Sequence, residues 1–169
     1  MRRRKLLWHL FPSYLLITII AVAAVSVYSY VTLSRFYLDE TEEALTSLAT
    51  LLEERMRPLL AEGDADAMGA VARELGPSIS TRVTVISPSG TVLADSDEDR
   101  SVMDNHADRP EVVRAMSGET GASTRYSYTL EQNMMYVALP VTRDGRVTAV
   151  VRTSVPLTAI EEQLRSVRG

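Results

Sequence analysis

Three aspartates at alternate positions are the clearest candidates for a metal site in this sequence. Asp95, Asp97 and Asp99 have the spacing that begins an EF-hand calcium loop. The pattern then fails, because the position that requires glycine holds Arg100 and the final glutamate position holds His106. We therefore expect a solvated acidic loop with no bound metal and no other cofactor. The alternative is an acidic surface that holds a divalent ion against lipid head groups.

Side chains for catalysis are scarce. The chain has 169 residues, no cysteine and two histidines, His9 and His106, so disulfides, thiolate metal sites and cysteine nucleophiles are excluded. His9 lies within an apolar stretch, which leaves His106 alone for a serine–histidine pair, and the sequence has no Gly-x-Ser-x-Gly elbow. We expect no enzymatic activity within this chain.

The charges are distributed unevenly along the chain. Four basic residues stand at positions 2 to 5, and the rest of the chain has 14 arginines against 22 acidic residues, a net charge of −8. An acidic body lacks the basic stripe that binds phosphate backbones, so nucleic acid is excluded as a partner. The apolar fraction of 46% is that of a globular protein, and the length suits one domain with a short appendage.

A membrane-spanning helix is predicted near the N-terminus. No charged residue occurs from Leu6 to Ser34, a stretch of 29 residues, whereas about 20 suffice to span a bilayer. The basic cluster before it predicts a cytoplasmic N-terminus and an exported body. A cleaved signal peptide is the alternative, with a site at residues 21 to 23, but the apolar stretch continues for ten residues beyond that site. We therefore predict a cytoplasmic stub and membrane helix over residues 1–34, with a single span.

A helical segment is predicted over residues 35–76. Leu45, Leu48, Leu52 and Met56 follow one another at spacings of 3, 4 and 4 residues, which indicates an amphipathic helix. We predict that this stripe faces a second copy of the chain, and packing within its own domain remains an equal alternative. A second, short helix is expected from the cap at Asp64 to a stop at Gly76-Pro77.

The remaining residues predict an α+β fold. The helix that begins at Arg109-Pro110-Glu111 separates two groups of strands, and Thr158 with Glu161 forms a capping box for a final helix over residues 158–169. We expect a five-stranded antiparallel sheet with helices on one face. The predicted strands are 81–86, 91–94, 123–128, 135–141 and 147–155.

Several of these segments resemble a known family of sensors. The runs 82–96, 118–127 and 135–141 are similar to the extracytoplasmic PAS-like (single Cache) sensor region of bacterial two-component histidine kinases, with the greatest similarity to the phosphate-regulon sensor kinases. The resemblance implies a PAS-like sensor sheet over residues 77–157, an exit helix over 158–169, and a homodimer in the bacterial inner membrane. The stimulus would be a small anion, an envelope metabolite or an envelope protein.

The kinase transmitter of that family is missing from this sequence. Neither histidine is followed by the acidic residue that marks a phosphoacceptor, and no glycine-rich ATP lid is present. A response regulator would therefore be a partner only through a transmitter outside this chain.

The resemblance also implies a ligand pocket. Related sensors turn one face of the sheet and its helical flap toward a small cavity, and arginine and tyrosine side chains suit an anion there. The alternative for each residue is a structural role, either in an ion pair or in the core. The residues at the corresponding positions are His106, Arg109, Arg125, Tyr126, Tyr128 and Tyr136.

The sequence thus supports two classes of function. The first is a signal-input module that passes binding outside the cell to a cytoplasmic kinase, or to a chemoreceptor or cyclase output that carries the same sensor. The second is a single-span anchored binding or scaffold protein that transmits no signal.

Overall fold

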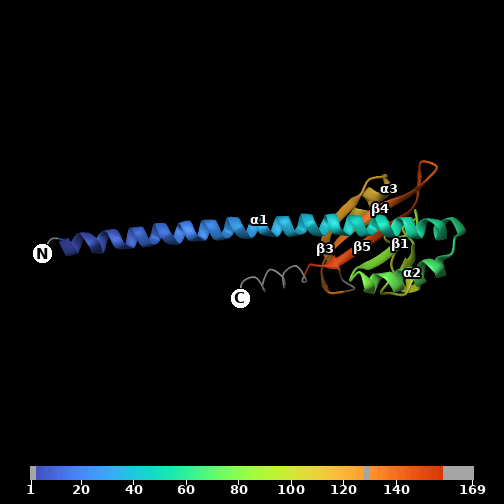
Figure 1. Cartoon of the computed structure of the whole chain (residues 1–169), viewed down its shortest axis with the longest axis horizontal. Coiled ribbons are helices and arrows are strands. Elements are labelled where there is room, and N and C mark those ends of the chain that lie inside the picture. The colour runs from blue at the N-terminus through green and yellow to red at the C-terminus, as the bar shows by residue number, and fades with distance from the viewer. Residues whose placement is uncertain (1–2, 128–129, 158–169) are drawn as a thin grey trace. The chain divides into compact units, whose positions relative to one another are not determined.

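The computed structural model describes residues 3–127 and 130–157. It divides into two compact units, Met1–Glu40 and Thr41–Gly169. The helices and strands are shown in Figure 1. In chain order they are α1 (Arg3–Glu62), α2 (Ala65–Ser78), β1 (Arg82–Ile86), β2 (Val92–Asp95), the short 3-10 helix η1 (Arg100–Val102), α3 (Pro110–Met116), β3 (Gly121–Ser127), β4 (Gln132–Arg143) and β5 (Arg146–Pro156).

The first unit consists of the N-terminal part of α1. Its large apolar side chains from Phe11 to Phe36 are exposed, and within the described chain one helix is long and apolar enough to cross a membrane by length and composition. These side chains are what a bilayer-spanning helix requires, because lipid is as apolar as they are.

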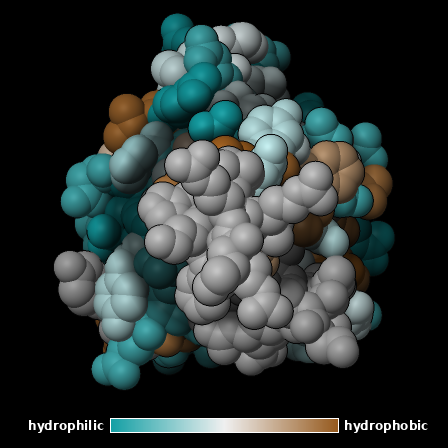
Figure 2. Space-filling model, turned by 90° about the vertical axis from the view of Figure 1, so that its left-hand side faces the viewer, coloured by the Kyte–Doolittle hydropathy of each residue, from teal (hydrophilic) through white to brown (hydrophobic). Residues whose placement is uncertain are grey.

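The second unit is built on a five-stranded sheet with the order β2-β1-β5-β4-β3, and every neighbouring pair is antiparallel. Hairpins join β1 to β2 and β4 to β5, and the pairing of β1 with β5 brings the two groups of strands together. This arrangement confirms the predicted α+β class. On the face of the molecule shown in Figure 2, hydrophilic residues cover much of the visible surface and apolar residues appear in separate patches.

Helices cover both faces of the sheet, so the prediction of helices on one face is wrong. One cluster joins Leu52 and Met56 of α1 and Met68 of α2 to the odd-numbered positions Val83 and Val85 of β1. A second cluster joins α3 to the even-numbered positions, at Ile86, Ala138 and Val150. Alternate residues of a strand point to opposite faces of the sheet. Each of the two apolar faces must therefore pack against its own helices.

The apolar stripe of α1 packs within its own domain. Leu45, Leu52 and Met56 are buried there, and Leu48 is half-buried. These three side chains pack within their own domain, as the alternative prediction has it. A side chain that packs on its own sheet is not available to a partner helix. A homodimer stays a prediction, and it would need another surface.

Helix α2 begins as predicted and ends later than predicted. The Asp64 side chain accepts a hydrogen bond from the Ala67 N–H at 2.9 Å, as an N-cap should. The helix continues through Pro77 to Ser78, and the N–H of Ile79 closes its last turn on the carbonyl of Leu75. Gly76 does not end the helix. Its missing side chain leaves room for Ser96, because a Cβ at position 76 would lie 2.7 Å from the Cβ of Ser96.

The acidic loop contains η1, which the sequence did not predict. Asp99 caps this turn by accepting hydrogen bonds from the N–H and the hydroxyl of Ser101. The predicted helix over 158–169 and the pocket candidate Tyr128 lie outside the described residues.

Candidate functional site

A cavity of about 230 Å³ lies on the α3 face of the sheet. The strands supply its floor, because even positions of β1, β4 and β5 and odd positions of β3 point to this face. The segment before α3 supplies its rim. The strand residues that line it are Arg82, Arg125, Ser127, Tyr136 and Arg152, and the rim residues are Glu98, Val102, Met103, Asp104, His106 and Arg109.

Four of the six predicted pocket residues meet in this cavity, namely His106, Arg109, Arg125 and Tyr136. Tyr126 is not among the lining residues, because it follows Arg125 on β3 and so points the other way; its side chain is 45% exposed. That these four residues bind a ligand remains a prediction.

The carboxylate of Glu111 forms ion pairs with two arginines of the cavity, Arg125 and Arg152. Glu111 is fully buried in the first turn of α3 and accepts hydrogen bonds from the Ser123 hydroxyl at 2.6 Å, Arg125 Nη2 at 3.1 Å and Arg152 Nη1 at 3.3 Å. Burial alone would raise the pKa of Glu111, but the hydrogen bonds from Arg125 and Ser123 and the charge of Arg152 lower it overall. Gly121 permits this contact, because a Cβ there would lie 2.0 Å from the backbone carbonyl oxygen of Glu111.

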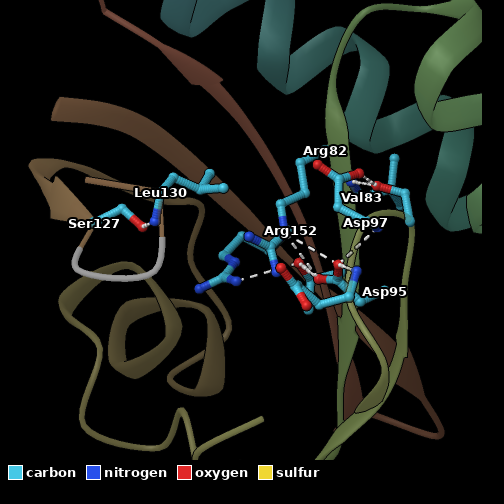
Figure 3. A network of polar contacts seen from close by, with 10 residues as sticks. Arg82, Val83, Asp95, Asp97, Ser127, Leu130 and Arg152 are labelled. Carbon is cyan, nitrogen blue, oxygen red and sulfur yellow. Dashed lines mark hydrogen bonds and ion pairs between the residues drawn. The ribbon is translucent and has the colours of Figure 1, made fainter. Parts of the chain in front are cut away.

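A second carboxylate, Asp95, holds the other end of the network (Figure 3). Arg82 Nε donates to both of its oxygens, at 3.1 and 3.2 Å, and the Thr84 hydroxyl donates to it at 2.7 Å. Arg152 Nη2 in turn donates to the Thr84 oxygen at 3.2 Å. Arg152, with 3% of its surface exposed, is thus tied to both buried carboxylates, directly to Glu111 and through Thr84 to Asp95.

Tyr136 supports two of the guanidinium groups. The central carbon of Arg125 lies 4.0 Å from the centroid of the Tyr136 ring, and that of Arg152 lies 5.0 Å from it. Cation–π contacts of this kind fix the planes of the guanidinium groups without consuming their N–H donors.

Several buried nitrogen atoms of the residues that line this cavity lack a hydrogen-bond partner. Among the described residues, the buried Nε atoms of Arg109, Arg125 and Arg152 and the Nδ1 of His106 make no hydrogen bond, although Asp108 Oδ1 lies 3.5 Å from Arg109 Nε. An unsatisfied buried polar group costs about 1–3 kcal/mol, so the residues that line this cavity include polar groups that are incompletely paired. Burial, and then the charges of Arg152 and Arg109, lower the pKa of His106.

The three aspartates of the acidic loop do not share a site. Asp95 belongs to the buried network, Asp97 accepts a hydrogen bond from the Ser96 hydroxyl, and Asp99 caps η1. Within the described ranges, no group of three histidine or acidic side chains is placed to hold a metal ion. Another cavity, of about 400 Å³, separates this loop from α2, and its ion pair between Arg100 and the exposed Asp66 indicates a solvated groove.

Three site residues were not predicted from the sequence, namely Arg82, Glu111 and Arg152. Arg152 left a usable signal, since it directly follows the apolar run Ala149-Val150-Val151 and lies on the same face as Val150. A charged residue at such a position is rarely buried without a partner. Its partner Glu111 left none, because a glutamate in the first turn of a helix is explained by the helix dipole alone.

Comparisons with known proteins identify the fold. No family model matches the chain, and no curated protein matches it. Among solved structures, it is similar to the sensor domain of the Vibrio cholerae histidine kinase DctB, with 21% identity and a TM-score of 0.59 over 74% of this chain and 51% of that one. It is also similar to the Escherichia coli DcuS sensor domain, with 12% identity and a TM-score of 0.58 over 74% of this chain and 98% of that one.

Chemoreceptor domains give similar values. The ligand-binding domain of the Pseudomonas aeruginosa amino acid chemoreceptor PctC, in complex with GABA, shows 17% identity and a TM-score of 0.60 over 73% of this chain and 61% of that one. This chain thus spans about half the length of the DctB domain and nearly all of the DcuS domain. The expected similarity to phosphate-regulon kinases receives no support from these structures. The chain has the PAS-like, Cache-type fold of bacterial sensor domains.

Proposed function

We propose that this chain is the signal-input module of a bacterial transmembrane sensor and that the cavity on the α3 face binds a small anion. The observation that carries the proposal is the convergence of four arginines, Arg82, Arg109, Arg125 and Arg152, on one cavity. A carboxylate or similar oxyanion supplies acceptor atoms for their N–H donors, and guanidinium groups bind it through paired hydrogen bonds.

The charges around the cavity favour an anion of low charge. Four arginines line it, and the two buried carboxylates, Asp95 and Glu111, neutralise only two of them. Glu98 and Asp104 also reach the lining, but both are exposed, so solvent screens them. Their repulsion still disfavours a multiply charged ligand.

An amino acid is the second candidate. The same two rim carboxylates could accept an ammonium group while the arginines hold the carboxylate. The structural neighbour PctC is an amino acid chemoreceptor. A zwitterion would satisfy both kinds of lining residue.

Strand β5 offers a route from the cavity to α1. Arg152 points into the cavity region, and its neighbour Thr153 points to the other face, where its hydroxyl donates to the carbonyl oxygen of Leu45 at 3.1 Å. Helix α1 runs without interruption from Arg3 to Glu62 and includes the apolar stretch from Leu6 to Ser34. We propose that this stretch anchors the module in the inner membrane, with the body outside, and that a shift of β5 reaches the membrane through α1.

Binding to the full chain in lipid nanodiscs tests this proposal. We expect at least one of acetate, succinate, phosphate, serine and GABA to raise the midpoint of thermal unfolding relative to chloride, since a ligand at 100 times its Kd adds about 2.7 kcal/mol. Arg125→Gln should remove this stabilisation. Arg114→Gln is the matched control, because Arg114 forms an exposed pair with Glu119.

Two results would contradict the proposal. One is a wild-type chain that none of the five compounds stabilises. The other is equal stabilisation of the Arg125→Gln and Arg114→Gln variants, which would place the ligand elsewhere.

A further inference from the structure

A second cavity, of about 340 Å³, lies beside the anion site. It is formed where α2 ends and where β4 begins and β5 ends. Its apolar lining comes from Pro77, Leu130, Met134 and Pro156. Met134 is buried and pairs with Pro156 across β4 and β5, so the floor of this cavity is apolar where the floor of the first is charged.

The two cavities adjoin on one face of the sheet. Tyr136 of the first cavity pairs with Ser154 of the second, and Ser154 pairs with Arg82, which lines both. The turn after β3 also links them, because the Leu130 N–H of the second cavity donates to the hydroxyl oxygen of Ser127 in the first, at 3.3 Å. Figure 3 shows Ser127 and Leu130 on one side of Arg152, with Arg82 on the other.

An unpaired hydroxyl lies at the junction. Ser154 is buried, lines the second cavity and sits in register between Tyr136 and Arg82, and its Oγ has no hydrogen-bond partner in the described parts of the chain. Ser154 therefore marks the point at which the lining changes from the arginines of the first cavity to the apolar residues of the second.

We infer that the sensor recognises an amphipathic carboxylate, whose anionic head occupies the arginine cavity and whose apolar tail extends past Ser154 into the second cavity. This inference rests on the proposed function and narrows it to one class of ligand. The head accepts hydrogen bonds from the guanidinium groups of Arg109, Arg125 and Arg152, and the tail buries its methylene groups against Met134 and Leu130.

A series of straight-chain carboxylates from acetate to hexanoate tests this inference by isothermal titration of the full chain in nanodiscs, with empty nanodiscs subtracted. We expect Kd to fall with each added methylene, by up to about fourfold where the group is fully buried. Met134→Gln should flatten this dependence and leave the Kd for acetate unchanged, because Met134 does not line the arginine cavity.

A second variant guards against misfolding of the first. Leu130→Asn alters a half-buried residue of the same cavity and should also flatten the series, whereas Val113→Asn, at an exposed position of α3, should not. If short carboxylates bind with no gain from chain length, or if the gain survives both cavity variants, the inference is wrong and the anion site stands. If no carboxylate of any length binds, the inference fails together with the carboxylate site on which it rests.

Discussion

The two faces of the sheet bury residues of opposite character. On the face toward α1 and α2, Val83, Val85 and Val151 meet Met56 and other aliphatic side chains. The α3 face also has an apolar cluster, but beside that cluster it buries an ionic network of two carboxylates and several arginines. A domain of this size can stabilise its fold with aliphatic packing, so charges placed in its interior indicate a second requirement, which we propose is ligand recognition.

The difference is one of geometry as well as of composition. Aliphatic side chains fill space and tolerate exchange for others of similar volume. The charged face fixes directions, because Glu111 receives hydrogen bonds from three side chains and Tyr136 holds two guanidinium planes. A ligand that competes for those donors therefore meets a site that is already oriented.

Removal of the central carboxylate should have the largest effect. Glu111→Ala leaves Arg152 buried without its direct carboxylate partner, and breaking a buried ion pair from one side costs about 3–5 kcal/mol of unfolding free energy. Pulse proteolysis of the full chain in urea would measure this loss. Glu119→Ala, which removes an exposed partner of Arg114, should change the same quantity by about 1 kcal/mol or less. Equal effects of the two variants would mean that the buried network does not stabilise the charged face.

The second-largest effect on the free energy of unfolding should come from truncation of a side chain on the apolar face. Met56 is fully buried against the sheet, and Met56→Ala should lower the free energy of unfolding by about 3 kcal/mol through lost burial and a cavity. The control on the same helix is Leu51→Ala, because the Leu51 side chain is 64% exposed. The same proteolysis assay applies. A larger effect at Leu51 than at Met56 would instead show that the exposed side of α1 is covered in the native protein and would revive the dimer seam on that side.

Periodicity predicted most of this fold. Each of the five strands alternates or forms a short apolar run between turn residues. The N-cap Asp64 and the first-turn proline Pro110 mark two helix starts. The number of covered faces did not follow from the same patterns, because a polar residue between apolar ones predicts a solvent-exposed face even where that residue is buried. In β1 the burial of Thr84 beside Val83 and Val85 shows why.

The candidate site was predictable only in part. The resemblance to sensors pointed to His106, Arg109, Arg125 and Tyr136, which the structure gathers around one cavity. Glu111 and Arg152 were beyond reach as a pair, since 41 residues separate them and only the pairing of the strands with α3 brings their side chains together. Long-range ion pairs leave no local pattern.

The smallest expected effect concerns pH on the charged face. Burial and the positive charges of Arg152 and Arg109 lower the pKa of His106 below its usual 6.5, while Glu98 and Asp104 on the same rim are exposed. The unfolded chain therefore takes up a proton before the folded chain does, and stability falls as the pH drops from about 6.5 toward the folded pKa. One group contributes at most about 1.4 kcal/mol per pH unit. Urea titrations between pH 7.5 and 5 should show a weaker acid dependence for His106→Gln than for the wild type.

A bound anion should reverse part of the decrease in the pKa of His106. The pH dependence of His106 is thereby linked to ligand binding. A carboxylate held beside His106 favours the imidazolium form and raises the pKa of His106 relative to the empty cavity. By linkage, acidification between pH 6.5 and 5 should then strengthen carboxylate binding in the wild type more than in His106→Gln. Titration of the ligand at pH 7 and pH 5.5 measures both affinities. Equal pH dependence in the two proteins would remove His106 from the site and leave the arginines as its cationic groups.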